Sequence, residues 1–401
     1  MSALELLLLA GAGALALARW APAGLRRPLT GAAAALTVLS GTALALRGPR
    51  WQLLPVLAGA VAGLALTVRR PGPLAGRAVR LWYPAREPPG DAERAQYLGR
   101  TRGEARTVAA GLTGHLGLPA FLLDGAARAR TAAIPGAAVA EGDERFPVVV
   151  FSPGLGGVRT QSTVWAEELA SRGYVVAALD HPYDSAAVVL DDGRTIPTRL
   201  RADDDPSDDD RQAAGWTAVR AADLSFALTQ LGRLDRGALP GPLRGRIDAG
   251  HAAATGHSLG GAAALQAVRQ DSRFDAVVDI DGFPRDPAPR PFRQPALALT
   301  AGIDAGGRRE AERYATRLAR VLDLSTSPSY RLIVPGAAHL TFTDAPLYLP
   351  PVPAFVGTLG RSAGPATTAA ATAAFLDATL RGRPGDLASN LARHGDLATF
   401  A

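Results

Sequence analysis

Residues 252–261 read Ala252-Ala253-Ala254-Thr255-Gly256-His257-Ser258-Leu259-Gly260-Gly261. A short apolar run passes directly into the pattern Gly-x-Ser-x-Gly, and a helical pattern follows over 259–270. A serine between a strand and a helix is typical of a nucleophile elbow, whose sharp turn tolerates only small neighbours. Ser258 is therefore predicted to be a catalytic nucleophile. Leu259, the next residue, is predicted to offer its backbone N–H to the oxyanion that forms during acyl transfer.

The chain around this motif alternates between short apolar runs and helical stretches. The predicted strands are 78–83, 146–151, 174–179, 252–255, 275–280, 296–300 and 330–334. The predicted helices are 162–172, 212–232, 259–270, 308–322 and 367–380. This alternation predicts an α/β fold with a doubly wound, mostly parallel sheet. With the elbow it indicates an α/β-hydrolase fold over residues 75–401.

A serine hydroxyl needs a base within hydrogen-bond reach, which is normally histidine. The α/β-hydrolase order is serine, acid, histidine, so the base should follow Ser258 in the chain. His339 lies in a short loop after the last predicted strand, whereas His394 lies in a polar C-terminal tail where we expect it to be solvated. We therefore predict that His339 is the base. His181 precedes the nucleophile and is expected to be structural.

The base in turn needs a carboxylate that fixes its tautomer. Asp281 ends the strand after the elbow helix, and Asp304 follows the next strand, which is the commoner location in this fold. Asp279 lies two residues deeper in the same strand as Asp281. The residues alone do not decide between Asp281 and Asp304.

The second oxyanion donor should come from a loop that follows an earlier strand. Residues 151–157, Phe151-Ser152-Pro153-Gly154-Leu155-Gly156-Gly157, fit this role because glycines let the backbone turn its N–H groups inward. Leu155 is the predicted donor. The rival interpretation is a phosphate-binding loop, but no P-loop lysine is present. The acidic run 203–210 lacks the spacing of an EF-hand and is expected to be a solvated loop.

The first 70 residues differ in composition from the rest of the chain. Leu29–Leu46 and Trp51–Val68 are uncharged segments of a length that approaches the thickness of a bilayer core, and Leu4–Ala18 is a shorter apolar segment. We therefore predict a membrane region over 1–70 with two or three transmembrane helices. More arginines flank these helices on the side of the large domain, which favours a multi-pass protein of the cell membrane with a cytoplasmic catalytic domain.

The formal charge of +6 comes from this same region. Residues 1–70 hold seven arginines and one acidic residue, Glu5, so the remainder of the chain is neutral. A nucleic-acid-binding domain would need a basic face on the folded part of the protein, so nucleic-acid binding is not expected. The chain has no cysteine, which excludes disulfides, thiolate-bound metals and a thiol nucleophile.

From Arg80-Leu81-Trp82-Tyr83-Pro84-Ala85 to the C-terminal helix, the chain resembles the platelet-activating factor acetylhydrolases, the plasma and type II intracellular enzymes with their bacterial relatives. The residues that carry the resemblance are 151–157, 256–261, Asp279-Ile280-Asp281-Gly282 and His339-Leu340-Thr341-Phe342-Thr343-Asp344. The resemblance places the triad acid at Asp281 and the oxyanion donors at Leu155 and Leu259. One departure is Pro153, where family members often have histidine.

The resemblance implies a metal-independent serine esterase that removes short or oxidised sn-2 acyl groups from glycerophospholipids and needs no cofactor. The expected partners are an ester or phospholipid substrate and the membrane bilayer. One alternative is a general carboxylesterase or polyester hydrolase of the cutinase or dienelactone-hydrolase type. Another, from a different class, is a catalytically silent interaction module bound to the membrane.

Overall fold

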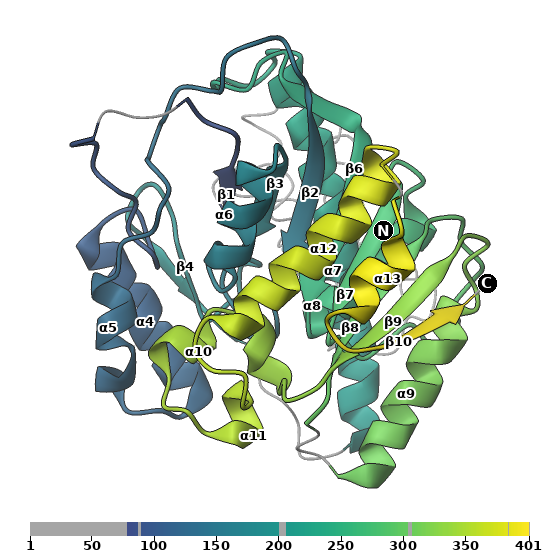
Figure 1. Cartoon of the computed structure of the whole chain (residues 1–401). Helices are drawn as coiled ribbons and strands as arrows, with labels where there is room; N and C mark the ends of the chain where they lie inside the picture. The colour runs from purple at the N-terminus through teal and green to yellow at the C-terminus, as the bar shows by residue number, and fades with distance from the viewer. Residues whose placement is uncertain (1–77, 87–89, 200–205, 304–306, 384, 401) are drawn as a thin grey trace, which may run out of the picture. The chain divides into compact units, whose positions relative to one another are not determined.

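An eight-stranded sheet with the order β1-β3-β2-β6-β7-β8-β9-β10 lies at the centre of the fold (Figure 1). The computed structural model describes residues 78–400 apart from 87–89, 200–205, 304–306 and 384. Its central strands are β1 (Val79–Trp82), β2 (Phe146–Ser152), β3 (Val175–Leu179), β6 (Ile247–His257), β7 (Ala276–Ile280), β8 (Ala296–Ala301), β9 (Ser329–Val334) and β10 (Asp396–Phe400). The edge strands β1 and β10 pair antiparallel, and the strands between them are parallel. The predicted mostly parallel sheet is confirmed.

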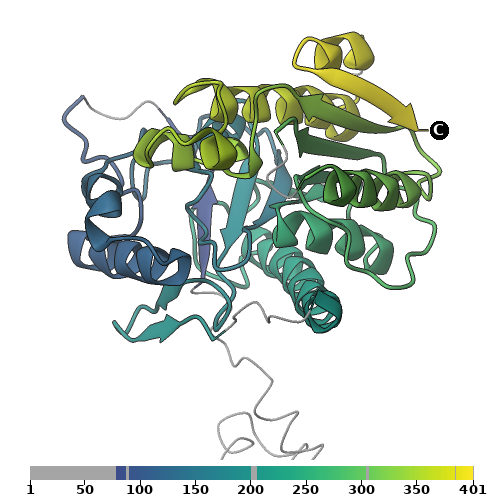
Figure 2. The ribbon, with the colours of Figure 1, turned by 90° about the horizontal axis from the view of Figure 1, so that it is seen from below.

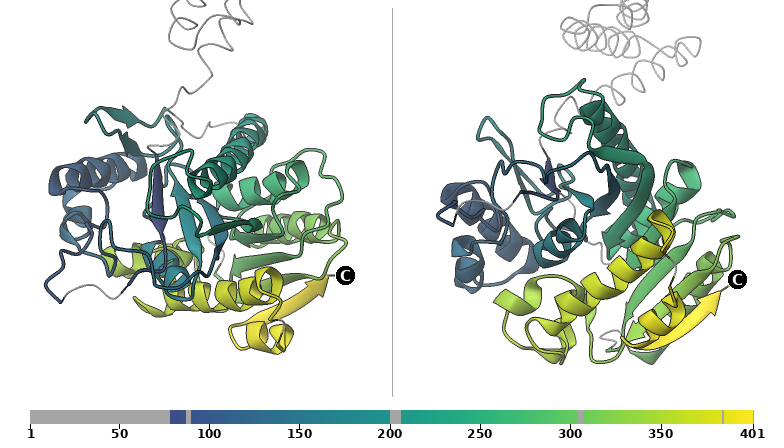
Figure 3. Two further views of the ribbon diagram at one scale, coloured as in Figure 1. Left: turned by 90° about the horizontal axis from the view of Figure 1, so that it is seen from above. Right: turned by 45° about the horizontal axis from the view of Figure 1, so that its top comes forward.

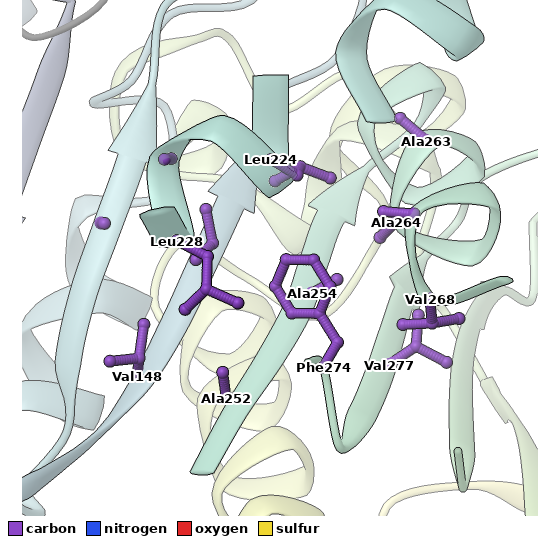
Figure 4. Close-up of a cluster of buried hydrophobic side chains, with 14 of the residues drawn as sticks. Val148, Leu224, Leu228, Ala252, Ala254, Ala263, Ala264, Val268, Phe274 and Val277 are labelled. Carbon is purple, nitrogen blue, oxygen red and sulfur yellow. The ribbon is translucent and has the colours of Figure 1, made fainter. Parts of the chain in front are cut away.

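Helices cover both faces of this sheet (Figures 1 and 2). One face carries α6 (Thr163–Ser171), α12 (Ala363–Leu380) and α13 (Leu387–Ala392); the other carries α7 (Pro206–Asp235), α8 (Leu259–Gln270) and α9 (Arg308–Leu322). On the second face, Leu224 and Leu228 of α7 and Val268 of α8 pack against Val148 and Val277 of the sheet (Figure 4). All seven residues of β2 are buried, as expected for a parallel strand between two helical layers.

A third group of elements lies beside the β1 edge of the sheet (Figure 3). It contains α4 (Arg102–Leu116), the 3₁₀ helix η3 (Ala120–Leu123), α5 (Asp124–Arg128) and the hairpin β4 (Ala187–Val189) with β5 (Thr195–Pro197). Val108, Leu123 and Val189 belong to the separate apolar cluster of this group. The 3₁₀ helix η4 (His339–Phe342), α10 (Ala345–Tyr348) and α11 (Pro353–Val356) follow β9.

The polar C-terminal tail forms α13 and β10, because the free edge of β9 offers backbone hydrogen bonds that do not require an apolar sequence. The expectation of a solvated loop over 203–210 is wrong for residues 206–210. In the acidic run, residues 206–210 begin α7. Asp210 forms ion pairs with Arg285 and Arg313, so partners distant in the sequence order this segment. Residues 203–205 lie outside the described residues.

The predicted membrane region, 1–70, and its boundary with the catalytic domain lie outside the described residues. Within the described part of the chain, no helix combines the length and the apolar character that spanning a membrane requires.

Asp344 joins the segment after η4 to the start of α6. Its carboxylate accepts the backbone N–H groups of Thr163 at 2.7 Å and Val164 at 3.3 Å. No side chain of α6 itself caps this helix, so Asp344 supplies the missing cap from a distant segment. The Asp344 side chain is buried, and this burial raises its pKa to about 7 even though the two N–H groups lower it.

We predict that Asp344 makes the stability of the fold depend on pH. The pKa in the folded chain lies above the unfolded value of about 3.9, so the folded state holds this proton more tightly. The contribution of Asp344 to the free energy of unfolding is therefore fully present below about pH 4 and is lost as the pH rises towards about 7.

Asp344→Asn keeps an acceptor oxygen but cannot ionise. Urea unfolding of both proteins from about pH 4 to about pH 8 should show the variant gaining stability relative to the wild type as the pH rises. A difference between the two proteins that does not change with pH would contradict the prediction.

Candidate active site

The turn between β6 and α8 holds Ser258 in an unusual backbone conformation. Ser258 has φ 56° and ψ −125° and immediately precedes the first residue of α8. Positive φ is uncommon for residues other than glycine and concentrates at functional sites. A Cβ atom on Gly260 would lie 2.0 Å from the carbonyl oxygen of Ser152, so only glycine lets the turn approach the end of β2. This is the geometry of a nucleophile elbow.

His339 and Asp281 form a hydrogen-bonded pair. The Nδ1 atom of His339 lies 2.7 Å from Oδ2 of Asp281. The other carboxylate oxygen of Asp281 accepts the N–H of Ala301 at 2.8 Å, which fixes its orientation. The side chain of Asp281 is only 8% exposed, whereas that of His339 is 47% exposed. The pair is thus anchored on the carboxylate side and open to solvent on the imidazole side.

The five site residues predicted from the sequence line a single pocket of about 640 Å³. They are Leu155, Ser258, Leu259, Asp281 and His339. A volume of this size suits a small-molecule ligand. Among the described residues, no group of three or more histidine or acidic side chains is placed to hold a metal ion.

The two predicted oxyanion donors occupy positions where an N–H can be free. Leu259 is the first residue of α8, and the first N–H groups of a helix have no partner within it. The N–H groups of Gly154 and Gly156 donate to Gln161 and Asp184. That of Leu155, between them, has no acceptor within the described part of the chain.

His257, the residue before Ser258, links the oxyanion loop to His339. The amide of Gln161 contacts Nδ1 of His257 at 3.2 Å and accepts the N–H of Gly154 at 3.3 Å. The Nε2 atom of His257 lies 2.9 Å from the carbonyl oxygen of His339. Burial lowers the pKa of His257 to about 3, helped by the nearby His339. A neutral His257 therefore donates to the backbone that carries the predicted base.

A buried arginine of α7 donates hydrogen bonds to the oxyanion loop. Arg220 is 1% exposed. Its guanidinium donates twice to the carboxylate of Asp184, at 2.6 Å each. It also donates to the carbonyl oxygens of Pro153 and Gly154, the latter at 3.0 Å. Because Asp184 also accepts the N–H of Gly156, one ion pair fixes both sides of the turn at Leu155.

Ser152 and His181 form a second Ser–His pair with the hydrogen-bond pattern of a catalytic one. The Nε2 atom of His181 lies 2.9 Å from Oγ of Ser152, and its Nδ1 atom lies 2.7 Å from Asp223. Ser152 is fully buried, and its Oγ also accepts a hydrogen bond from Arg220. Neither Ser152 nor His181 lines the pocket that contains Ser258. The pair supports the base of the oxyanion loop.

The other sequence candidates do not join the site. Asp279 is fully buried beneath the elbow, where it accepts the N–H of Gly282 at 2.9 Å, and burial raises its pKa well above the usual range. His394 lies between α13 and β10 and is absent from the pocket lining. Asp304 lies outside the described residues.

Sequence reasoning missed Arg220, Asp184, Gln161 and the role of His257. For Arg220 a signal was present, because it falls at helical spacing on the buried stripe of α7 that includes Ala213, Thr217 and Leu224. A charge on a buried stripe requires a buried partner. The identity of that partner was not readable, because Asp184 lies 36 residues away in an irregular loop.

The chain is similar to several known proteins. The profile of the family described as "Platelet-activating factor acetylhydrolase, isoform II" matches residues 67–194. A protein of Arthroderma benhamiae, named "Probable 1-alkyl-2-acetylglycerophosphocholine esterase", is 31% identical over 34% of this chain and 31% of its own length. The platelet-activating factor acetylhydrolase of Gallus gallus is 24% identical over 50% of this chain and 53% of its own. The chain thus spans about a third to a half of these curated relatives.

A solved structure is similar over a longer stretch. The ferulic acid esterase from Streptomyces cinnamoneus is 31% identical, covers 83% of this chain and 92% of its own, and superimposes with a TM-score of 0.64. Residues 67–194 are therefore similar to the platelet-activating factor acetylhydrolase isoform II family, and most of the chain is similar in sequence and fold to a solved esterase.

Proposed function

We propose that this protein is a serine esterase that works through an acyl-enzyme on Ser258. The observation that carries the proposal is the 2.7 Å pair of His339 and Asp281 in the same pocket as the strained Ser258. An exposed imidazole with a fixed carboxylate behind it is the arrangement that activates a serine.

The steps follow from this arrangement. Ser258 Oγ attacks the carbonyl carbon of the ester, and its proton passes to Nε2 of His339, whose Nδ1 faces Asp281. The N–H groups of Leu155 and Leu259 stabilise the oxyanion of the tetrahedral intermediate. His339 then gives the proton to the departing alcohol, and a water molecule, activated by the same histidine, releases the acid and regenerates Ser258.

For the substrate, we propose short or oxidised sn-2 acyl groups of glycerophospholipids. This proposal rests on the family and on the name of the Arthroderma relative. A second candidate is an ester of an aromatic hydroxy acid, as the name of the Streptomyces structure suggests. The aromatic side chains of Trp216, Phe283 and Tyr314 line the pocket and favour this second candidate. A general carboxylesterase would show no preference for either class.

A substrate panel separates these candidates. The full chain is assayed with a short sn-2 acyl phospholipid, a feruloyl ester and a simple ester of matched acyl length. The highest kcat/KM on the phospholipid would support the first proposal, and the highest on the feruloyl ester would support the second. Equal values on all three would favour the general carboxylesterase.

We predict that Ser258→Ala abolishes covalent labelling by a fluorophosphonate and lowers kcat by about 10⁴-fold or more, because the nucleophile is lost. Labelling is measured by mass spectrometry, and hydrolysis is measured with the substrate panel. The chain offers a matched control in Ser152→Ala, since Ser152 also pairs with a histidine but is fully buried. Labelling that persists in Ser258→Ala and disappears in Ser152→Ala would reassign the nucleophile; no labelling of the wild type would favour the silent interaction module.

We also predict that Arg220 acts as a positioning residue for the oxyanion loop. A lysine keeps the positive charge, but its ammonium group cannot donate hydrogen bonds to Asp184 and to two carbonyl oxygens at once, as the planar guanidinium does. Arg220→Lys should lower kcat by roughly 10²-fold, the scale of losing one oxyanion donor, with little change in KM. Asp184→Asn, which removes the charge at constant shape, should have the same effect.

Arg233→Lys is the control, because Arg233 lies on the exposed side of the same helix. Thermal unfolding identifies variants that are folded. An unchanged kcat in folded Arg220→Lys and Asp184→Asn would contradict the positioning role.

We further propose that residues 1–70 anchor the protein as a multi-pass membrane protein, with the catalytic domain on the cytoplasmic side. The support is the uncharged length of Leu29–Leu46 and Trp51–Val68 and the surplus of arginine beside the large domain. The full chain should stay in the membrane pellet after alkaline carbonate extraction. Added protease should digest the catalytic domain in inside-out vesicles and spare it in intact cells. Recovery of the protein in the carbonate supernatant would contradict the anchor.

A further inference from the structure

Three residues that line the catalytic pocket carry buried polar atoms without hydrogen-bond partners among the described residues. The buried atoms that make no hydrogen bond with any described residue include Nε of Arg331, the hydroxyl of Tyr314 and the hydroxyl of Thr300. All three residues line the same pocket as Ser258. A buried polar group without a partner costs free energy, so three of them around one cavity indicate that a ligand supplies the missing partners.

The sheet and α9 bring these groups to one place. Thr300 of β8 and Arg331 of β9 lie on the face of the sheet that α9 covers, because their strand neighbours Leu299 and Leu332 belong to the core on the opposite face. Tyr314 points from α9 into the same space. Ala311 and Ala315 of α9 also line the pocket, and their small side chains leave room beneath the helix.

The charge of Arg331 and the neighbouring hydroxyl donors favour an anion at these three residues. Arg331 forms no ion pair with any carboxylate of the described chain, and its guanidinium carries a permanent positive charge. The Tyr314 hydroxyl stays protonated because burial raises its pKa well above the usual value, so it can donate. Asp281 is already occupied by His339 and Ala301. Thr300 adds a second hydroxyl donor.

Three further arginines lie around the ring of Phe283 and share one carboxylate. Arg285, Arg313 and Arg317 all pair with Asp210 and all stack on the ring of Phe283. Glu310 also lines the pocket, and its side chain is exposed. The three arginines place positive charge beside the part of the pocket that Phe283 lines.

We propose that Arg331, Tyr314 and Thr300 form a subsite for an oxyanion, a carboxylate or phosphate, that the ester substrate itself carries. This inference rests on the proposed esterase function and deepens it by naming the charge of the substrate. The anion has two possible sources: a second carboxylate at the far end of the acyl group, or a phosphodiester on the alcohol.

The test compares two matched pairs of substrates with the full chain. The first pair is a monoester of adipic acid and the hexanoate ester of the same alcohol, which differ only at the end of the acyl group. The second pair is a short-chain 2-acyl glycerophospholipid and the corresponding glycerolipid without the phosphate. We expect kcat/KM to favour the anionic member of at least one pair by about 10-fold or more, as for a charge-assisted hydrogen bond. The pair that shows the preference identifies the source of the anion.

Variants then assign the preference to the subsite. Arg331→Met keeps much of the side-chain volume and removes the charge, so it should bring the ratio within the pair close to 1. Tyr314→Phe should reduce the ratio by a smaller factor. Arg320→Met, on the exposed side of α9, is the control for a general loss of positive charge and should leave the ratio unchanged.

Inhibition of the wild type gives a measurement that needs no variant. Free adipate or glycerol phosphate should inhibit hydrolysis of the neutral ester at lower concentrations than the uncharged hexanamide or glycerol. The subsite is overturned if the wild type treats both members of both pairs alike, or if its preference survives in Arg331→Met. Hydrolysis of the neutral esters that is lost in Ser258→Ala keeps the esterase proposal intact in either case, so the two failures are distinguishable.

Discussion

The backbone of Ser258, held at positive φ between β6 and α8, is the constraint on which the rest of the site depends. The turn is possible only because glycine at 260 lets the first turn of α8 meet the carbonyl oxygen of Ser152 at the end of β2. This contact brings the elbow and the oxyanion loop together. At this point the chain segments that leave two neighbouring strands turn to opposite faces of the sheet. Open α/β sheets bind ligands at such a switch point.

Strain is concentrated at this edge of the sheet. Tyr183, Ser258 and Asp281 are the residues other than glycine with positive φ in the described part of the chain. Asp281 turns at the end of β7, and Tyr183 lies in the loop that carries Asp184. Such conformations persist only where the surroundings overdetermine them. Here the surroundings are the parallel ladder of β2, β6 and β7 and the buried pair of Arg220 with Asp184.

Two sets of buried polar groups surround the reaction centre. They differ in whether their hydrogen-bonding atoms have partners. Around the oxyanion loop, Arg220, Asp184, His181 and Ser152 satisfy one another, which gives rigidity. Beneath α9, Arg331 and the two hydroxyls have no partners within the described chain. The first set explains how an oxyanion hole is held in place, and the second is the reason to expect a charged substrate.

The sequence by itself determined the sheet strands that end at the site, the elbow at Ser258 and the choice of His339 by chain order, because these features depend on local pattern and on a fixed order of residues. It left Asp281 and Asp304 open until a family resemblance was used. Only the tertiary structure decided which carboxylate approaches His339, that Arg220 donates to the loop at Leu155, and that Arg331 and Tyr314 line the same pocket. Each of these arrangements brings together residues of different helices, strands or loops, and the packing of helices on the sheet sets such distances, which no local pattern encodes.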